Sequence, residues 1–103
     1  MSKPLITVLM TVYNGQDYLR PALESVLAQT YKNFELLIID DASSDDSLRI
    51  IKSYQDPRIA VYSNPQNLGQ TRSLNVGLKF ATGEYIARMD ADDLVFSAWL
   101  AEL

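Results

Sequence analysis

The sequence contains no cysteine and no histidine. These absences exclude disulfide bonds, thiolate chemistry, a histidine base and zinc sites of the usual kind. Positive charge is also scarce, because 9 Lys and Arg stand against 13 Asp and Glu, which gives a net charge of -4. Such a chain offers no basic stripe that could displace the counterions of a nucleic acid. We therefore expect no nucleic-acid partner.

The length and composition are those of one globular domain or a piece of one. The chain has 103 residues, of which 48% are hydrophobic and 21% are charged. Its first residues, Met1 to Pro4, lead directly into an apolar run that is too short for a signal peptide or a membrane span. We therefore expect the protein in the cytoplasm.

Two kinds of hydrophobic pattern alternate along the chain. Nearly continuous apolar runs at 5–12, 34–39, 58–62 and 84–89 predict strands, the first two of them covered on both faces. Apolar residues at helical spacing follow each of the first three runs and predict helices between the strands. This order predicts an α/β fold of three layers (α/β/α) with a mostly parallel sheet and right-handed crossovers.

Single residues are expected to begin and end these helices. Asn14 is a candidate N-cap for the first helix, and Ser43 or Ser44 for the second. Gly83 is expected to stop the third helix. The inward side of the third helix would carry Leu74, Gly77, Leu78 and Ala81.

Polar residues stand where each predicted strand ends. Ligands of parallel α/β sheets bind beyond the carboxyl ends of the strands, so these residues should meet at one edge. The groups are Thr11-Val12-Tyr13-Asn14, Asp40-Asp41-Ala42-Ser43, Ser63-Asn64 and Asp90-Ala91-Asp92-Asp93.

The last of these groups places three carboxylates within four positions. Aspartates repel one another and are poor strand formers, so folding alone gives little reason to cluster them. A hard divalent cation would give that reason, because it prefers oxygen ligands and cancels the repulsion. If the strand continued through them, Asp90 and Asp92 would point to the same side, roughly 6–7 Å apart at Cα. A solvated acidic turn that caps a following helix is the alternative.

Two enzyme and signalling classes with related folds fit the positions less well. A phosphoacceptor receiver domain would need acids after its first and third strands, where this chain has Thr11-Val12-Tyr13 and Ser63-Asn64. A sugar-nucleotide pyrophosphorylase would need a loop rich in glycine and lysine after its first strand, and Tyr13-Asn14-Gly15-Gln16 is not such a loop.

From Ile6 to Asp93, the sequence resembles the inverting family 2 glycosyltransferases. The resemblance implies the nucleotide-diphospho-sugar transferase fold, which is GT-A-like and Rossmann-like, and the chain would be its N-terminal nucleotide-binding half. The motifs that carry it stand in the family's order: 6–14, 24–31, Phe34 to Asp45, Asn67-Leu68-Gly69 and Gly83 to Asp93.

The resemblance also implies roles for individual residues. Thr11 and Tyr13 would lie beside the nucleobase and ribose, and Asp40 would accept a hydrogen bond from the base edge. Asp90 would be the first acid of a D-x-D motif, near the ribose and the metal. Asp92 would be the second acid and would coordinate Mn²⁺ or Mg²⁺. No role in the chemistry is assigned to Asp41, which could either support the residues that contact the ligand or be a solvated neighbour.

The implied reaction is metal-dependent transfer of a sugar, with inversion, from a UDP-linked donor. The acceptor would be a hydroxyl of a glycan or of a lipid-linked glycan, as in polysaccharide biosynthesis, and the full-length enzyme could associate peripherally with a membrane. A cation bound at the motif would neutralise charge on the departing nucleoside diphosphate. A non-catalytic nucleotide-binding or interaction module that retains the fold is the alternative.

One departure from the family pattern bears on this expectation. Ser73-Leu74-Asn75 lacks the basic residue that many relatives carry there, and Arg72 could reach the phosphates instead or simply lie solvated on the helix. Arg88 could pair with one of the site aspartates. In the family the catalytic base lies beyond the D-x-D motif, so we expect it outside this chain. A chain truncated after this motif is then expected to bind nucleotide weakly and to transfer little or no sugar.

The last ten residues carry several large apolar side chains. Phe96, Trp99 and Leu100 are expected to be exposed, because little chain follows that could cover them. Such a surface favours dimerisation or strand exchange, so a homodimer through this C-terminal segment is also expected.

Overall fold

The computed structural model describes residues 3–103 and confirms the predicted alternation of strands and helices. The elements, in chain order, are β1 (Ile6–Val12), α1 (Leu19–Leu27), β2 (Phe34–Asp40), α2 (Ser47–Lys52), β3 (Ile59–Ser63), α3 (Gln70–Phe80), β4 (Tyr85–Asp90) and the short 3-10 helix η1 (Leu100–Glu102).

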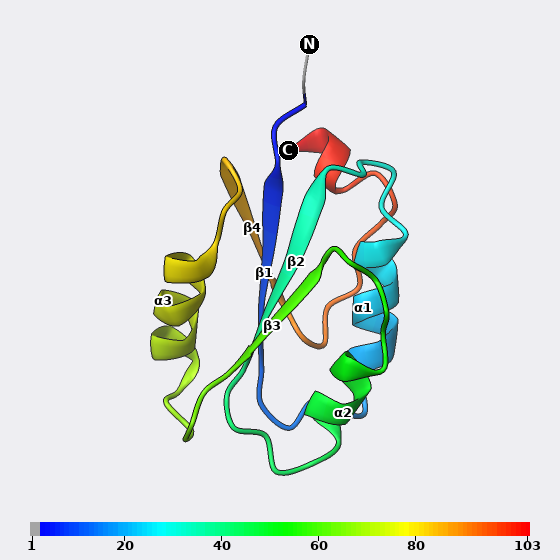
Figure 1. Ribbon diagram of the computed structural model, residues 1–103. Helices are drawn as coiled ribbons and strands as arrows, with labels where there is room; N and C mark the ends of the chain where they lie inside the picture. The colour runs from blue at the N-terminus through cyan, green and yellow to red at the C-terminus, as the bar shows by residue number, and fades with distance from the viewer. Residues whose placement is uncertain (1–2) are drawn as a thin grey trace.

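The four strands form one all-parallel sheet in the order β3-β2-β1-β4. Figure 1 shows α3 on one side of this sheet and α1 and α2 on the other, so the three-layer architecture is confirmed. The register pairs Val12 with Asp40 and Thr11 with Asp90. The polar residues that follow β1, β2 and β4 therefore meet at one edge, as expected.

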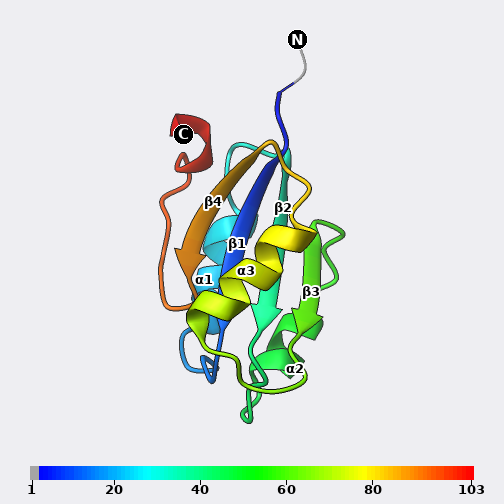
Figure 2. The ribbon, with the colours of Figure 1, turned by 90° about the vertical axis from the view of Figure 1, so that its left-hand side faces the viewer.

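The sheet buries its two faces to different extents. On the side of α1 and α2, the large core cluster combines alternate residues of β1, β2 and β4 with the apolar stripe of α1. The smaller cluster on the other side is built from Leu9, Leu37 and Ile39, against which α3 packs. In Figure 2, α3 crosses β1 and β2, while β4 forms one edge of the sheet. Consequently, Ile86 and Arg88 of β4 share the α3 side but remain exposed.

Close packing of α3 on the sheet depends on Gly77. A Cβ atom at this position would lie 2.4 Å from Leu9 Cδ1 and 3.3 Å from Ile39 Cγ1. The prediction that Leu78 also points inward is wrong, because its side chain is 52% exposed. Successive helical residues are about 100° apart, so a helix that turns Gly77 directly onto the sheet turns Leu78 away from it.

The residues predicted to begin and end the helices do not do so. Helix α1 begins at Leu19, well after Asn14, and α2 begins at Ser47 rather than after Ser43 or Ser44; neither helix has a side-chain N-cap hydrogen bond. Gly83 does not end α3, whose C-cap is Ala81. Instead Gly83 allows close approach to β1, because a Cβ there would lie 2.5 Å from the Thr7 backbone nitrogen.

The C-terminal segment folds back along α1 and is better covered than the sequence suggested. Leu100 is 1% exposed and Trp99 is half-buried, so their expected exposure is wrong, whereas Phe96 is 59% exposed as predicted. The buried Gln29 holds the segment. Its amide donates to the Phe96 carbonyl at 2.7 Å and accepts from the Leu100 N–H at 2.9 Å.

Candidate functional site

A cleft of about 420 Å³ opens at the carboxyl edge of the sheet, between the ends of β1 and β4. Besides the end of β1, four separate parts of the chain line the cleft: the β1–α1 loop, the residue after β2, the first turn of α3 and the turn after β4. The lining residues with polar or aromatic side chains are Thr11, Tyr13, Asn14, Tyr18, Asp41, Gln70, Ser73, Asp90 and Asp92.

Thr11, in β1, and Tyr13, just after it, line the same wall of the cleft, and the roles expected for them at the nucleobase and ribose stay predictions. Thr11 is half-buried and is the register partner of Asp90. Tyr13 is 55% exposed, so its ring offers an open aromatic face rather than packing into the core.

Of the two acids after β2, Asp41 lines the cleft and Asp40 does not. Both are buried. Successive side chains of a strand alternate between faces, so the two carboxylates leave β2 on opposite sides. The Ser43 N–H donates to Asp40 Oδ2 at 3.3 Å, and Asp40 Oδ1 has no hydrogen-bond partner among the described residues. The nucleotide-binding role expected for Asp40 stays a prediction, and Asp41 is not the solvated neighbour that the sequence allowed.

Asp41 joins the end of β2 to the loop before α3. Its Oδ1 accepts hydrogen bonds from the Leu68 N–H at 2.7 Å and from Asn64 Nδ2 at 2.9 Å, and its Oδ2 accepts from the Gly69 N–H at 2.9 Å. Burial alone would raise the pKa of this carboxyl group, but the hydrogen bonds from Leu68, Asn64 and Gly69 outweigh it and lower the pKa. Asp41 is thus an ionised carboxylate built into the floor of the cleft.

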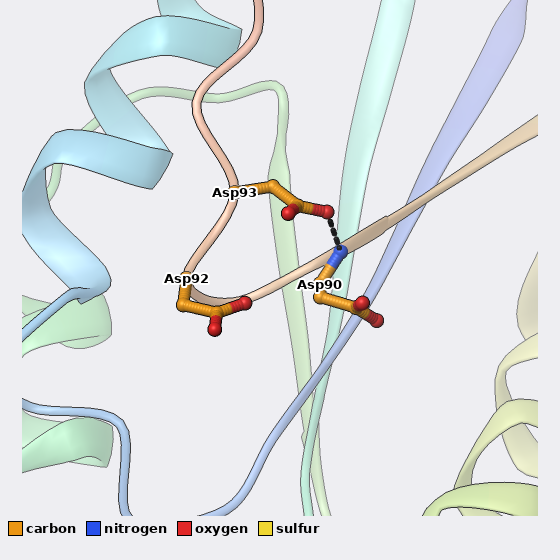
Figure 3. Close-up of side chains that lie close together, drawn as sticks. All are labelled: Asp90, Asp92 and Asp93. Carbon is orange, nitrogen blue, oxygen red and sulfur yellow. Dashed lines mark hydrogen bonds between the residues drawn. The ribbon is translucent and has the colours of Figure 1, made fainter.

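The three acids after β4 lie together on a turn (Figure 3). One carboxylate oxygen from each of Asp90, Asp92 and Asp93 lies within 4.8 Å of the others. The strand ends at Asp90, so Asp92 does not continue it, and the expected extended spacing of the two acids is wrong. The Asp90 N–H donates to Asp93 Oδ2 at 2.9 Å, which closes the turn. Asp93 thus shapes this turn and caps no helix.

Asp90 and Asp92 differ in their contacts. Gln70 Nε2 donates to Asp90 Oδ1 at 3.4 Å, and the Arg88 guanidinium lies 3.7 Å from the same oxygen. The predicted pairing of Arg88 with a site aspartate is therefore confirmed. Among residues 3–103, no hydrogen bond or ion pair involves the Asp92 carboxylate. Its oxygens are available to a cation, and all three side chains provide the hard oxygen donors that Mg²⁺ or Mn²⁺ prefers. The donor set thus fits the expected metal.

Gln70 and Ser73 of α3 also line the cleft, although the sequence analysis did not select them. Ser73 is fully buried, and its Oγ accepts from Asn64 Nδ2 at 2.9 Å. A signal for both was present, because they lie three residues apart just after Gly69, where a parallel α/β sheet presents the first turn of a helix to its ligand edge. Arg72, between them, is exposed.

Comparison with known families identifies the class. The model of glycosyl transferase family 2 matches residues 7–103, and the chain therefore belongs to this family. The likeness of the motifs from Ile6 to Asp93 is thereby confirmed.

Named relatives and solved structures agree with this assignment. The chain is 42% identical over 89 residues to the UDP-Glc:alpha-D-GlcNAc-diphosphoundecaprenol beta-1,3-glucosyltransferase WfaP of Escherichia coli, covering 86% of this chain and 36% of WfaP. The crystal structure of S. aureus TarS 1-349 in complex with UDP-GlcNAc superposes with a TM-score of 0.90 at 30% identity, covering 94% of this chain and 29% of TarS.

A third similar protein is a mannosyltransferase. The mannosyltransferase PcManGT of Pyrobaculum calidifontis, solved in complex with GDP-Man and Mn²⁺, superposes with a TM-score of 0.84 at 26% identity, covering 90% of this chain and 29% of PcManGT. The fold is therefore of the GT-A type, as expected.

The chain spans about a third of the length of the curated relatives it matches. Among residues 3–103, no helix combines the length and the apolar character that crossing a membrane requires.

Proposed function

We propose that this chain forms the nucleotide-sugar-binding part of an inverting, metal-dependent glycosyltransferase. The donor is a UDP-linked sugar, and the acceptor is a hydroxyl of a glycan or a lipid-linked glycan. One observation carries the proposal: Thr11, Tyr13, Asp41, Asp90 and Asp92, from three separate strand ends, line a single cleft. That position is where parallel α/β sheets bind their ligands.

Two relatives support a UDP-linked donor. The TarS structure contains UDP-GlcNAc, and the name of WfaP specifies UDP-Glc together with a lipid-linked acceptor. PcManGT was solved with GDP-Man, so membership of the family alone does not determine which nucleobase the donor carries. For this reason the test must compare nucleotides.

Tyr13 and Asp41 are the residues we propose for the nucleoside. The exposed ring of Tyr13 can stack on a base, and the Asp41 carboxylate lines the same cleft as a possible acceptor for the edge of that base. The role expected for Asp40 is thus proposed for Asp41, which is the acid that lines the cleft.

Asp92 is the residue we propose for the cation, with Asp90 beside it. A bound Mn²⁺ or Mg²⁺ would supply charge neutralisation for the departing diphosphate. Asp90 already accepts from Gln70 and lies near Arg88, so it is better suited to hold a ribose hydroxyl than to bind the cation alone. PcManGT, with its Mn²⁺, supports the metal requirement.

The proposed roles leave no carboxylate among the described residues that line the cleft to act as the catalytic base that deprotonates the acceptor hydroxyl. Among the described residues that line it, Asp41, Asp90 and Asp92 already have roles in this scheme. We therefore propose that the base is supplied by residues outside this chain, and we expect little or no sugar transfer by the 103-residue chain itself. Robust turnover by this chain would refute that part of the proposal. The cytoplasmic location also stays a prediction.

Calorimetric titration with UDP, GDP and ADP, each with and without Mn²⁺, tests the proposal. We expect UDP to bind most tightly, and Mn²⁺ to strengthen its binding at least about tenfold. Asp92→Asn should remove the Mn²⁺ effect, and Glu102→Gln, which removes one exposed negative charge far from the cleft, should retain it.

Two outcomes would contradict the proposal in different ways. If the affinity for UDP is the same with and without Mn²⁺, the metal site is refuted but the nucleotide site is supported. Binding of no nucleotide under any condition would favour a non-catalytic module that retains the fold.

A further inference from the structure

The loop that follows β1 has an unusual backbone at Asn14. This residue has a positive φ of 51°, in the left-handed region that asparagine tolerates better than most residues do. It directly follows Tyr13, and it precedes Gly15, whose N–H donates to Ser47 Oγ at 2.9 Å. The chain therefore turns immediately after Tyr13, the aromatic residue that follows β1.

The Asn14 side chain ties this loop to the loop after β2. Its Oδ1 accepts from the Ser44 N–H at 2.8 Å and from the Asp45 N–H at 3.3 Å. In return, the Asn14 N–H donates to Ser43 Oγ at 3.0 Å. Asn14 thus makes reciprocal hydrogen bonds between the two loops, next to the contacts of Gln16, whose N–H donates to Asp45 Oδ2 at 3.2 Å and whose Oε1 accepts from the Asp46 N–H at 2.8 Å.

Each loop carries one residue of the cleft. Tyr13 stands immediately before Asn14, and Asp41 stands two residues before Ser43. Hydrogen bonds to the α3 loop fix the Asp41 carboxylate, whereas Tyr13 is 55% exposed and has little packing to fix its ring. Of the residues that link the two loops, Asn14 is the one adjacent to Tyr13, so its backbone and its bridge bear most directly on where the ring lies relative to Asp41.

From this geometry we infer that Asn14 is the positioning residue for the nucleoside part of the site. It acts through Tyr13, and it leaves the acids after β4 untouched, because no hydrogen bond among the described residues links Asn14 to the turn from Asp90 to Asp93. The inference rests on the proposed function, since it assumes that the cleft takes a nucleoside diphosphate.

Three variants separate the bridge from the backbone conformation. Asn14→Gly allows the positive φ and keeps the backbone N–H that donates to Ser43 Oγ, but it removes the Oδ1 half of the bridge, whereas Asn14→Asp keeps both the acceptor and a residue that tolerates this φ. Asn33→Gly is the matched control. It removes an exposed asparagine whose Nδ2 donates to the Lys3 carbonyl at 2.7 Å, in the loop before β2.

Binding of UDP and of inorganic pyrophosphate, each in the presence of Mn²⁺, distinguishes positioning from general damage. In Asn14→Gly we expect UDP to bind about tenfold more weakly, the size expected for the loss of one stacking contact. Pyrophosphate, which has no base, should bind as in the parent chain. Asn14→Asp and Asn33→Gly should bind UDP within about threefold of the parent. Equal losses for UDP and pyrophosphate, or no loss for UDP, would overturn the inference.

A measurement without ligand keeps the inference testable if the parent chain binds no UDP. Backbone ¹⁵N order parameters report whether Tyr13 is held in place. We expect the order parameter of Tyr13 to fall in Asn14→Gly and to stay high in Asn14→Asp, with Asp92 unchanged in both. An unchanged Tyr13 in Asn14→Gly would refute the positioning role. Absence of UDP binding by the parent chain would refute the proposed function instead.

Discussion

Two groups of aspartates lie at the carboxyl edge of the sheet, one at the end of β2 and one at the end of β4, and they differ in how deeply their side chains are buried. Asp40 and Asp41, after β2, are 2% and 3% exposed, and Asp41 accepts three hydrogen bonds from the loop before α3. Asp90, Asp92 and Asp93, after β4, are all exposed. The first group is held by hydrogen bonds to the surrounding loops, and the second is open to solvent. A cluster of aspartates in a sequence therefore does not by itself indicate which role it has.

The difference follows from the position of each strand in the sheet. Strand β2 is an inner strand with helices on both faces, so residues at its end are covered by the loops that lead into α2 and α3. Strand β4 is an edge strand that α3 does not cover, so the turn after it stays open. A carboxylate at the covered end must find hydrogen-bond donors, and one at the open end can remain solvated until a cation binds.

The largest expected effect is the loss of stability in Asp41→Asn. An amide cannot accept the three hydrogen bonds that Asp41 accepts now, so buried N–H groups of the α3 loop would lose a charged partner. We expect the free energy of unfolding to fall by about 2–4 kcal/mol. Urea unfolding followed by circular dichroism measures it. Asp92→Asn is the matched control and should change stability by less than about 0.5 kcal/mol.

The second prediction concerns how the stability that Asp41 contributes changes with pH. The pKa of Asp41 is lowered in the folded protein, so its ionised form stabilises the fold above the ordinary aspartate pKa of 3.8, and this contribution is lost as the pH falls through the folded pKa. The difference in stability between the parent chain and Asp41→Asn should therefore be largest near neutral pH and should narrow below the ordinary pKa. Urea titrations between pH 7 and pH 2 check this. A difference that stays constant with pH would show that Asp41 contributes packing rather than charge.

The third prediction uses Mn²⁺ to separate the two groups. A cation that binds only the folded state raises the melting temperature, so Mn²⁺ with UDP should stabilise the parent chain. Asp92→Asn should lose the part of the shift that depends on Mn²⁺. Excess EDTA should lower the shift of the parent chain to the same level. If instead Asp92→Asn kept the full Mn²⁺ shift, the open group would not be the metal site.

The sequence predicted the order of the elements well because the composition of each strand indicates how far it is buried. β1 and β2 are apolar on both faces, α1 has a clear stripe, and the strand ends are marked by polar residues, so the three layers and the ligand edge followed. The choice between Asp40 and Asp41 could not be made in the same way. Side chains alternate between faces, so an uncertainty of one residue in where β2 ends exchanges the two acids.

Other parts of the site depend on contacts that no local pattern reveals. Asn14 looked like a helix cap because asparagine favours caps, but its acceptor is used by amides thirty and more residues later in the chain. The coverage of Leu100 similarly depends on Gln29, a polar residue whose burial is decided only when the C-terminal segment folds back. Long-range hydrogen bonds of this kind are specified by the whole fold rather than by the adjacent sequence.

The smallest expected effect distinguishes two members of the open group. Asp93 accepts the Asp90 N–H and so has a structural contact that Asp92 lacks among the described residues. Asp93→Ala should therefore lower the free energy of unfolding by about 0.5 kcal/mol, the low end for one exposed hydrogen bond, and Asp93→Asn should restore most of it because its carbonyl can accept the same N–H. Both variants should keep more of the Mn²⁺ response than Asp92→Asn does. If Asp93→Asn lost that response as fully as Asp92→Asn, the division of the turn into a residue that shapes it and a residue that binds the cation would be wrong, and both acids would belong to the metal site.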